Sequence, residues 1–489
     1  MTNILPYFLE YFKTNDLTKA FVIVLLVLAG WKYLRIPFRI SPKKIFILIF
    51  ALVLALRVFW LFFSSYTPKT HWDPMHMLES DVTNMHALDL TRGVWFRWAD
   101  GSPGDRRPIG YPMLVGLMYT VFGTNPWVAY TLNLALYALA AWLVFLMARL
   151  IFGEPVGLLA MFLFSIWPVS VYSIKLITDE HLFLPVWYGG LYLLLREAKG
   201  RPARWPLLWY GVFFGYAAMT RTHAVFMPFV VAFTYFLMKK PWRHVLVAFF
   251  TVALLMQVVN LPWIIRNYRA FKAPVLYTVT GDGLYGWVNS NATPEMNGAY
   301  PKPGDPEYAA DFEEARLNGD RGKAHTLGSR EIRHWILRHP AKFVTRGIAR
   351  VLVFMGWNRT GGVWPIWFQY YEGSYDPKRP MAPAVKEALE EISFASYYIL
   401  LFSFIFSVAF LWKRRAQIPE SSRLGLGVLA ACLFFWWCEH MIVFPDRKYR
   451  FPLEPLMIIA TSPFFYYLLT EFRFERLVSR FVKPNSRTA

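Results

Sequence analysis

The sequence predicts an all-α protein that crosses a membrane many times, and three observations lead to that prediction. Hydrophobic residues make up 56% of the 489 residues and charged residues only 17%, against about 45–50% and about 25% in soluble domains. Apolar runs close to the ~20 residues needed to span a hydrocarbon core recur along the chain. Lys and Arg gather in the short segments between these runs. A soluble globular fold is therefore excluded.

Eleven apolar stretches are expected to form transmembrane helices. They lie near residues 19–35, 44–65, 126–150, 156–175, 181–196, 206–220, 222–239, 243–265, 394–412, 424–444 and 453–470. The first ends in Trp31, Lys32 and Tyr33 rather than in small residues of a signal-peptide cleavage site, so it should remain as a helix. A shorter apolar piece, 111–123, is expected to form a re-entrant or interfacial helix.

The charge distribution predicts the orientation of these helices. Six short hydrophilic segments, at 35–44, 149–156, 196–204, 239–243, 413–423 and 471–489, carry 21 basic and 5 acidic residues. Short segments rich in Lys and Arg stay on the cytoplasmic side of a membrane. The N-terminus is then outside and the C-terminus inside a bacterial-type cytoplasmic (inner) membrane. Most of the net charge of +20 is accounted for in this way, so nucleic acid is not expected as a partner.

Four parts of the chain follow from this topology. Residues 1–43 form an extra N-terminal helix and basic loop, and residues 44–265 form a transmembrane core with a long outer loop at 66–110. Residues 266–393 form an extracytoplasmic loop subdomain, and residues 394–489 form C-terminal helices and a basic tail. Function is expected in the two long outer segments, because packed helices alone would not need them.

Carboxylates near the outer ends of helices are the first candidates for chemistry, because ionisable groups are costly to keep close to lipid. Glu79 and Asp81 lie in the first outer loop, where either could serve as a general base. Asp179 and Glu180 lie where one helix ends and the next begins, and could orient an acceptor or bind a cation. The alternatives are an exposed acidic loop and a helix-capping acid.

Basic residues at outer helix ends are the second group of candidates. An arginine fork can clamp a phosphate, whereas the alternative role is snorkelling to lipid headgroups. The positive-inside bias makes outer arginines less expected, which favours a functional role. The residues concerned are Arg221, Arg266, Arg447, Lys448 and Arg450.

Other motifs are missing from the sequence. It contains no phosphate-binding loop, dinucleotide fingerprint or nucleophile elbow, so nucleotide-driven transport is not expected. Cys432 and Cys438 lie in one apolar run and predict neither a disulfide nor a metal site. The acidic and histidine residues His71, Asp73, His76 and His86 fit no standard zinc spacing, and a solvated loop is the favoured interpretation.

Four strings of residues, taken together and in order, resemble the GT-C membrane glycosyltransferases, especially bacterial glycosyltransferase family 39 and its aminoarabinose-transferase relatives. The strings are Arg107-Pro108-Ile109-Gly110-Tyr111-Pro112 with Phe122-Gly123; Trp167-Pro168 through Tyr172-Ser173 to Glu180; Pro262-Trp263-Ile264-Ile265-Arg266-Asn267-Tyr268 followed by Gly283, Asn289, Asn291 and Gly298-Ala299-Tyr300; and Arg447-Lys448-Tyr449-Arg450-Phe451-Pro452-Leu453-Glu454-Pro455. The resemblance extends from about residue 44 to residue 470.

The resemblance implies a GT-C fold and an inverting transfer of a sugar from a polyprenyl phosphate to an acceptor on the outer face. An outer-loop carboxylate would be the base. The pattern Ser80-Asp81…His86 favours Asp81, whereas the spacing back from later residues places Glu79 in that position.

The resemblance also assigns binding roles. Developing phosphate charge would be stabilised by Arg266 and Arg447, with Arg221, Lys448 and Arg450 as further candidates. Substrate contacts are expected from His86, Tyr111, Tyr268 and Asn289. No cofactor is certain, and a divalent cation is left open. The expected partners are the lipid-linked sugar, an extracytoplasmic acceptor and the bilayer.

Two other functions remain as alternatives. An O-antigen polymerase or ligase would use a lipid-diphosphate-linked glycan, so the donor would separate it from a monophosphate-dependent enzyme. A lipid or solute transporter would place its substrate contacts near the bilayer midplane. The sequence specifies neither the sugar nor the acceptor.

Overall fold

The computed structural model describes residues 41–71, 79–98, 101–104, 107–277, 279–293, 299–356, 365–366, 381–443 and 445–470. The expected helix at 19–35 and the basic tail at 471–489 lie outside these ranges. Within them the chain is almost entirely helical, and the one bridge with both of its partners described joins Arg97 and Pro103. The predicted all-α fold is confirmed.

Long apolar helices form the main body of the molecule. Five of them are long and apolar enough to cross a membrane: α3 (Pro42–Phe63), α6 (Pro126–Phe152), α12 (Trp242–Phe271), α19 (Pro383–Lys413) and α20 (Glu420–His440). A sixth candidate is the pair formed by α7 (Glu154–Ser165) and Pro168–Lys175, bent by 57°. The chain is thus a multi-pass membrane protein, although the expected count of eleven spans is not confirmed.

The other expected spans are also helices, but they are shorter or more polar. They are α9 (Glu180–Ala198), α10 (Pro206–Thr220), α11 (Met227–Leu237), which follows the 3₁₀ turn η3 (Thr222–Phe226), and α21 (Glu454–Thr470). Helix α5 (Gly110–Phe122) is the short apolar helix expected at 111–123. Proline within the first two residues starts α3, α6, α10 and α11, where its missing N–H would have no helical partner.

Glycines allow neighbouring helices to approach closely. A β-carbon on Gly211 of α10 would lie 2.3 Å from Cβ of Leu255 on α12. One turn later a β-carbon on Gly215 would lie 2.9 Å from Cβ of Val259. This close packing of small residues is typical of membrane helix pairs, where no hydrophobic effect drives association.

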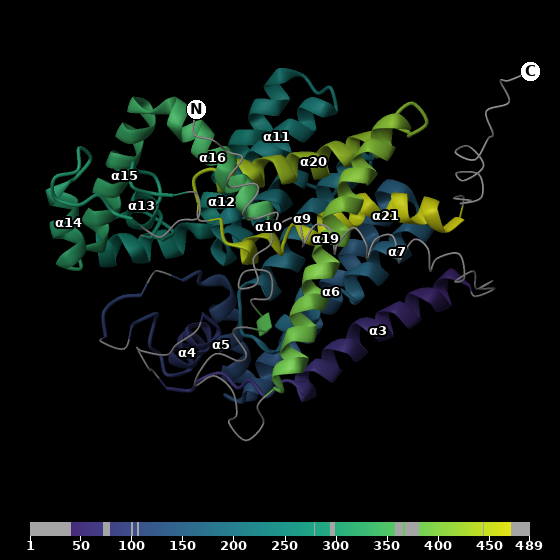
Figure 1. Ribbon diagram of the computed structural model, residues 1–489, viewed down its shortest axis with the longest axis horizontal. Coiled ribbons are helices and arrows are strands. Elements are labelled where there is room, and N and C mark those ends of the chain that lie inside the picture. The colour runs from purple at the N-terminus through teal and green to yellow at the C-terminus, as the bar shows by residue number, and fades with distance from the viewer. Residues whose placement is uncertain are drawn as a thin grey trace, which may run out of the picture.

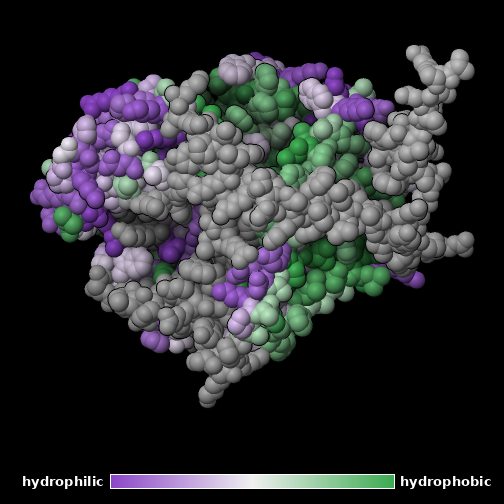
Figure 2. Space-filling model, viewed as in Figure 1, coloured by the Kyte–Doolittle hydropathy of each residue, from purple (hydrophilic) through white to green (hydrophobic). Residues whose placement is uncertain are grey.

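The outer segments form a separate polar region at one end of the molecule. Helices α13 (Val279–Tyr285), α14 (Ala310–Leu317), α15 (Arg321–Arg338) and α16 (Pro340–Met355) gather at the left in Figure 1. Phe312, Ile332 and Trp335 belong to their own small core. Figure 2 shows hydrophilic residues over α14 and α15 and hydrophobic residues over α3. The apolar helices and the polar helices are therefore gathered in different parts of the molecule.

Helix ends, rather than helix middles, meet beneath this polar region. The start of α4 (Glu79–Thr91) and the junction after η2 (Ser173–Lys175) supply carboxylates. The α10–η3 junction, the end of α20 and η4 (Arg447–Arg450) supply cations, histidines and aromatic rings. Polar groups collected there can be buried in protein while the apolar helix surfaces face lipid.

Substituting Gly211→Ala tests the close packing of α10 on α12. The added methyl would clash with a branched side chain on the facing helix, and overpacking of this kind costs about 1–3 kcal/mol. We expect a lower thermal unfolding midpoint, measured by size-exclusion chromatography of heated, detergent-purified protein. Gly427→Ala is the matched control, because its β-carbon would meet only the flexible tip of Leu237. Equal midpoints for the two variants would contradict the packing described here.

Candidate active site

The helix ends enclose a cavity of about 430 Å³, and several charged side chains line it. Its polar wall includes two carboxylates expected from the sequence, Glu79 and Asp179, and one expected arginine, Arg221. The lining residues are Glu79, Arg107, Pro108, Asp179, Arg221, Thr222, His223, Val225, Phe226, Phe229, Tyr277, Leu284, Trp287, Glu439, Ile442, Val443 and Tyr449.

Glu79, the first residue of α4, is held by two cations. Its Oε2 accepts a hydrogen bond from Nζ of Lys448 at 2.7 Å, and its Oε1 lies 3.2 Å from Nη1 of Arg107. Only 7% of Glu79 is exposed. The contact joins residues 369 positions apart and brings the expected basic string at 447–450 against the first outer loop.

A second ion pair includes Arg221, which lines the same cavity. Nη2 of Arg221 is 2.9 Å from Oε1 of Glu180, and both side chains are almost fully buried. The other terminal nitrogen, Nη1, has no hydrogen-bond partner in the described structure, and the guanidinium lies over the ring of Tyr449 at 5.0 Å. The position of Arg221 is therefore fixed, and its Nη1 can still donate a hydrogen bond to a ligand.

Asp179 precedes Glu180 and is also buried. Its Oδ1 has no hydrogen-bond partner among the described residues. Burying a carboxylate in this way favours its neutral form. Burial, together with the nearby charges of Glu79 and Glu180, raises the pKa of Asp179 well above its ordinary value.

Two of the three carboxylates that line the cavity, Glu79 and Asp179, thus differ widely in acidity. Burial by itself raises the pKa of Glu79, but Lys448, Arg107 and Arg221 outweigh it and lower the pKa far below the usual value for glutamate. Burial lowers the pKa of Lys448, but attraction to Glu79 raises it overall. Glu79 is consequently the ionised carboxylate and Asp179 the one that retains its proton to higher pH. A pair of this kind is typical of acid–base sites.

The remaining wall of the cavity is apolar and reaches the outer surface of the helix bundle. Val225 and Phe229 line the cavity and are also 42% and 46% exposed. Phe229 stacks on Phe435 of α20. An apolar surface beside a group of cations suits a ligand with an anionic head and a hydrocarbon tail.

Asp81, the base favoured from the sequence, lies outside this cavity. It is fully buried one residue beyond Ser80, and its Oδ1 accepts hydrogen bonds from the hydroxyl of Tyr66 at 3.1 Å and the amide of Lys69 at 2.9 Å. Its carboxylate holds the chain that enters the first outer loop.

Arg266 binds the first outer loop instead of the cavity. Its guanidinium donates to the carbonyls of Phe96 and Gly104, both at 2.9 Å, and lies over the ring of Trp263. Burial and the positive charges of Arg107 and Arg266 lower the pKa of His86, which stacks on Phe96, to about 4. These residues hold the loop that ends in Arg107. Arg266 also lines a second cavity of about 410 Å³.

Three other expected site residues, Tyr111, Tyr268 and Asn289, do not line the cavity. Tyr111 is buried and its hydroxyl donates to Asn133, and Tyr268 is 53% exposed on α12. Asn289 is buried, and its amide donates to the carbonyls of Tyr285 and Ala299. The side chain of Arg447 lies outside the described part of the structure.

Arg450 joins three parts of the fold. Its Nε lies 3.1 Å from Glu454, and its Nη1 donates to the carbonyls of Phe354 and Gly356. Oε2 of Glu454 in turn accepts from the indole of Trp167 at 2.7 Å. All of these contacts are buried, so Arg450 links η4 to the end of α16 and to α21.

Several cavity residues were missed from the sequence. Arg107 and Tyr449 both belong to the strings of residues recognised in the sequence. Arg107 could have been found by asking which cations in these strings can form ion pairs with the candidate carboxylates. His223, two residues beyond Arg221, and Glu439, directly before His440, lie at the ends of apolar runs, and only the fold brings them together. With His440 they form the one group of three close metal-ligand side chains among the described residues.

Comparison with known proteins gives a family for one segment of the chain. Residues 106–265 match the family model described as dolichyl-phosphate-mannose-protein mannosyltransferase. The match confirms the resemblance to membrane glycosyltransferases that the sequence predicts. A comparison with curated proteins finds no match.

Two solved structures are similar at low identity. One is the archaeal oligosaccharyltransferase AglB from Archaeoglobus fulgidus, in complex with an inhibitory peptide and a dolichol-phosphate. It has 12% identity and a TM-score of 0.48, covering 92% of this chain and 52% of that chain. The other is ArnT from Cupriavidus metallidurans bound to undecaprenyl phosphate, with 13% identity and a TM-score of 0.41, covering 86% and 78%. The chain spans about half the length of the archaeal protein.

Substituting Arg450→Gln tests the structural role of Arg450. The change leaves Glu454 buried without its cation, and breaking a buried pair in this way costs about 3–5 kcal/mol. We expect a clearly lower thermal unfolding midpoint of the purified protein, whereas Arg423→Gln at an exposed position of α20 should leave it unchanged. A fully stable Arg450→Gln protein that fails only to bind lipid phosphate would instead support the donor-binding role expected from the sequence.

Proposed function

We propose, proceeding from the family match over residues 106–265, that this chain is a glycosyltransferase that moves a sugar from a polyprenyl-phosphate donor to an acceptor on the extracytoplasmic face. One observation carries the proposal. A single cavity combines an ionised carboxylate, a second carboxylate of raised pKa, the cations Arg107 and Arg221, and an apolar wall that reaches the bundle surface, and Lys448 contacts the ionised carboxylate.

The donor is proposed to enter along the apolar wall. Its hydrocarbon chain would lie against Val225, Phe226 and Phe229, and its phosphate would meet Arg221, whose Nη1 has no other partner in the described structure. Lys448 and Arg107 would move part of their interaction from Glu79 to the phosphate. Charge-assisted hydrogen bonds of this kind stabilise a departing phosphate.

The reaction is proposed to be a single inverting displacement. The acceptor oxygen or nitrogen attacks the anomeric carbon, and its new bond forms as the bond from that carbon to the phosphate oxygen breaks. The acceptor's proton goes to Glu79, and the electron pair of the broken bond leaves with the lipid phosphate. Glu79 is preferred over Asp81 because it lines the cavity in ionised form. Its basicity rises once the phosphate shares its cations.

Asp179 is proposed to act in its neutral form. A protonated carboxyl can donate a hydrogen bond to the acceptor or to the phosphate, which an ionised one cannot. The neighbouring Glu180 keeps Arg221 in position through their buried ion pair.

Substituting Glu79→Gln tests the assignment of the base. General-base catalysis contributes about 10²- to 10⁴-fold, so we expect sugar transfer to fall by at least about 100-fold in a donor-to-acceptor assay with purified protein. Asp81→Asn is the matched control, since its amide oxygen can still accept from Tyr66 and Lys69. Loss of activity in Asp81→Asn with retention in Glu79→Gln would move the base to Asp81.

A pH profile tests the role of Asp179. A neutral carboxyl persists below its pKa, and the raised pKa of Asp179 extends that range upward. Activity that depends on the neutral form should therefore decline as pH rises through this pKa. We expect Asp179→Asn, which is neutral at every pH, to retain activity and to lack that decline. A variant that is folded but inactive at every pH would contradict this role.

Analysis of membrane lipids tests the donor class. Mass spectrometry of cells with and without the gene should show a polyprenyl monophosphate sugar that accumulates only when the gene is absent. Accumulation of a lipid-diphosphate glycan would instead favour a polymerase or ligase. Unchanged lipids together with lost solute flux would favour a transporter.

A further inference from the structure

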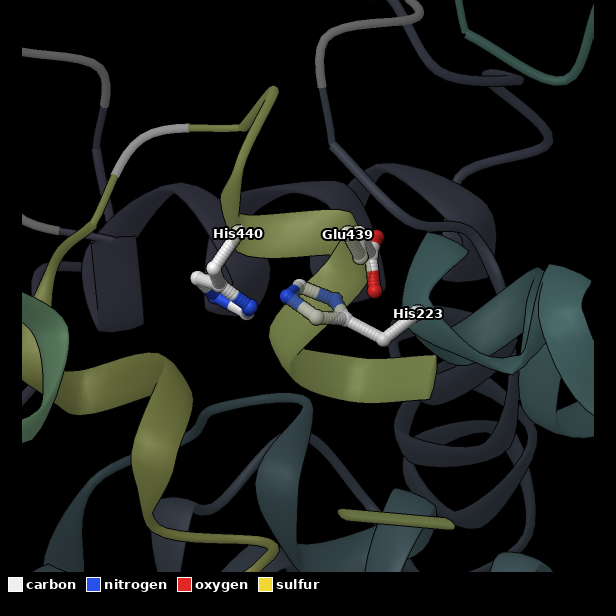
Figure 3. A group of neighbouring side chains, drawn as sticks. All are labelled: His223, Glu439 and His440. Atoms are coloured by element: carbon white, nitrogen blue, oxygen red, sulfur yellow. The ribbon is translucent and has the colours of Figure 1, made fainter. Parts of the chain in front are cut away.

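Three side chains with metal-binding atoms meet on one side of the cavity. His223 belongs to η3, and Glu439 and His440 are the last two residues of α20. Their ligand atoms lie within 4.8 Å of one another. In Figure 3 the imidazole rings of His223 and His440 face each other, and the carboxylate of Glu439 lies beside the ring of His223. At least 94% of each residue is buried, since the exposed fractions are 6%, 5% and 0%.

The polar atoms of this group lack partners in the described structure. Both ring nitrogens of His223, Oε2 of Glu439 and Nε2 of His440 make no hydrogen bond to any described residue. Leaving buried donors and acceptors unsatisfied costs about 1–3 kcal/mol each. Four such atoms in one place call for a compensating ligand, because buried polar groups are almost always paired.

His440 is already oriented as a metal ligand. Its Nδ1 lies 2.9 Å from the carbonyl oxygen of Trp436, and a carbonyl can only accept, so Nδ1 carries the proton. Nε2 then presents its lone pair towards the group. Metal-binding histidines usually have this second contact, which fixes both the tautomer and the ring orientation.

Aromatic packing holds both rings in place. His440 stacks on Phe354 with ring centroids 3.9 Å apart. His223 stacks on Trp436 at 4.7 Å and contacts Tyr449 at 5.2 Å. A metal with bonds of about 2.0–2.1 Å to nitrogen would draw together ligand atoms that lie within 4.8 Å of one another.

The surrounding charges are compatible with a bound cation. Arg221 and Lys448 are the nearby positive groups, and each is already paired with a carboxylate, Glu180 and Glu79 respectively. Oε2 of Glu439 makes no hydrogen bond to any described residue, and Arg221 is the cation whose charge acts on this carboxylate. A buried carboxylate oxygen without a hydrogen-bond partner is costly, and a divalent ion would compensate it.

We propose that His223, Glu439 and His440 bind one divalent transition-metal ion, with zinc the best fit to two imidazoles and one carboxylate. His223 and Glu439 line the cavity. A fourth coordination position would therefore face the cavity, as at zinc sites that keep one position for water or substrate. A phosphate oxygen is the ligand class that this position would accept.

Direct measurement of metal binding tests the proposal without any assay of sugar transfer. The full chain, purified in detergent and stripped with a chelator, is titrated with Zn²⁺ alone against a chromophoric chelator. We expect one tight site per chain, and Co²⁺ in its place should give the visible absorption of a tetrahedral ion. His440→Gln should weaken Zn²⁺ binding by at least about 100-fold.

Matched variants make each outcome decisive. His334→Gln removes a half-exposed histidine that also lies beside a glutamate, Glu331, and should leave binding unchanged. If His440→Gln fails to fold, Glu439→Gln together with the Co²⁺ spectrum of the wild-type protein gives the answer. Absence of tight binding in the wild type would overturn the proposal. So would binding that survives in His440→Gln but is lost in Glu79→Gln, because the ion would then lie at the other carboxylates.

Discussion

A carboxylate can remain ionised in a buried position beside a membrane only when cations are held against it, and Glu79 is in that position. Lys448 and Arg107 contact its two oxygens. They come from segments that are far apart in the chain, so the ion pairs can form only when the first outer loop, the RPIGYP string and the last outer turn are assembled together. The same contacts create the cavity and determine its electrostatics.

Each of these segments has its own anchor behind the cavity. Arg266 holds the loop before Arg107 through two backbone carbonyls. Arg450 holds η4 against α16 and α21, which positions the neighbouring Lys448. Gly110 allows α5 to start against the end of α10, since a β-carbon there would lie 2.6 Å from Oγ1 of Thr220. Arg266 and Arg450 thus hold the backbone in position, whereas Arg107 and Tyr449 line the cavity.

This division explains how far sequence reasoning could go. Helices are predictable from apolar run length, and the clusters near Glu79, Asp179, Arg221 and Lys448 are predictable because charges are costly near lipid. Which member of a cluster faces the cavity is not predictable, because it depends on helix phase and on tertiary contacts. Glu79 and Asp81 are two residues apart, yet one lines the cavity and the other contacts Tyr66. No sequence pattern identified His223 and Glu439 as site residues, because they come together only where η3 contacts α20.

The arrangement of charges also constrains how an anionic ligand can bind. Lys448 and Arg107 are both paired with Glu79, so a phosphate can gain their attraction only by sharing or displacing that carboxylate, whereas Nη1 of Arg221 has no hydrogen-bond partner in the described structure. Displacement would leave Glu79 with fewer cations and a higher pKa, which links donor binding to the appearance of a stronger base. A divalent ion held by His223, Glu439 and His440 would keep a net positive charge, because Glu439 is the one carboxylate in that group. Such an ion would add to the attraction that Arg221, which lines the same cavity, offers to the phosphate of the donor.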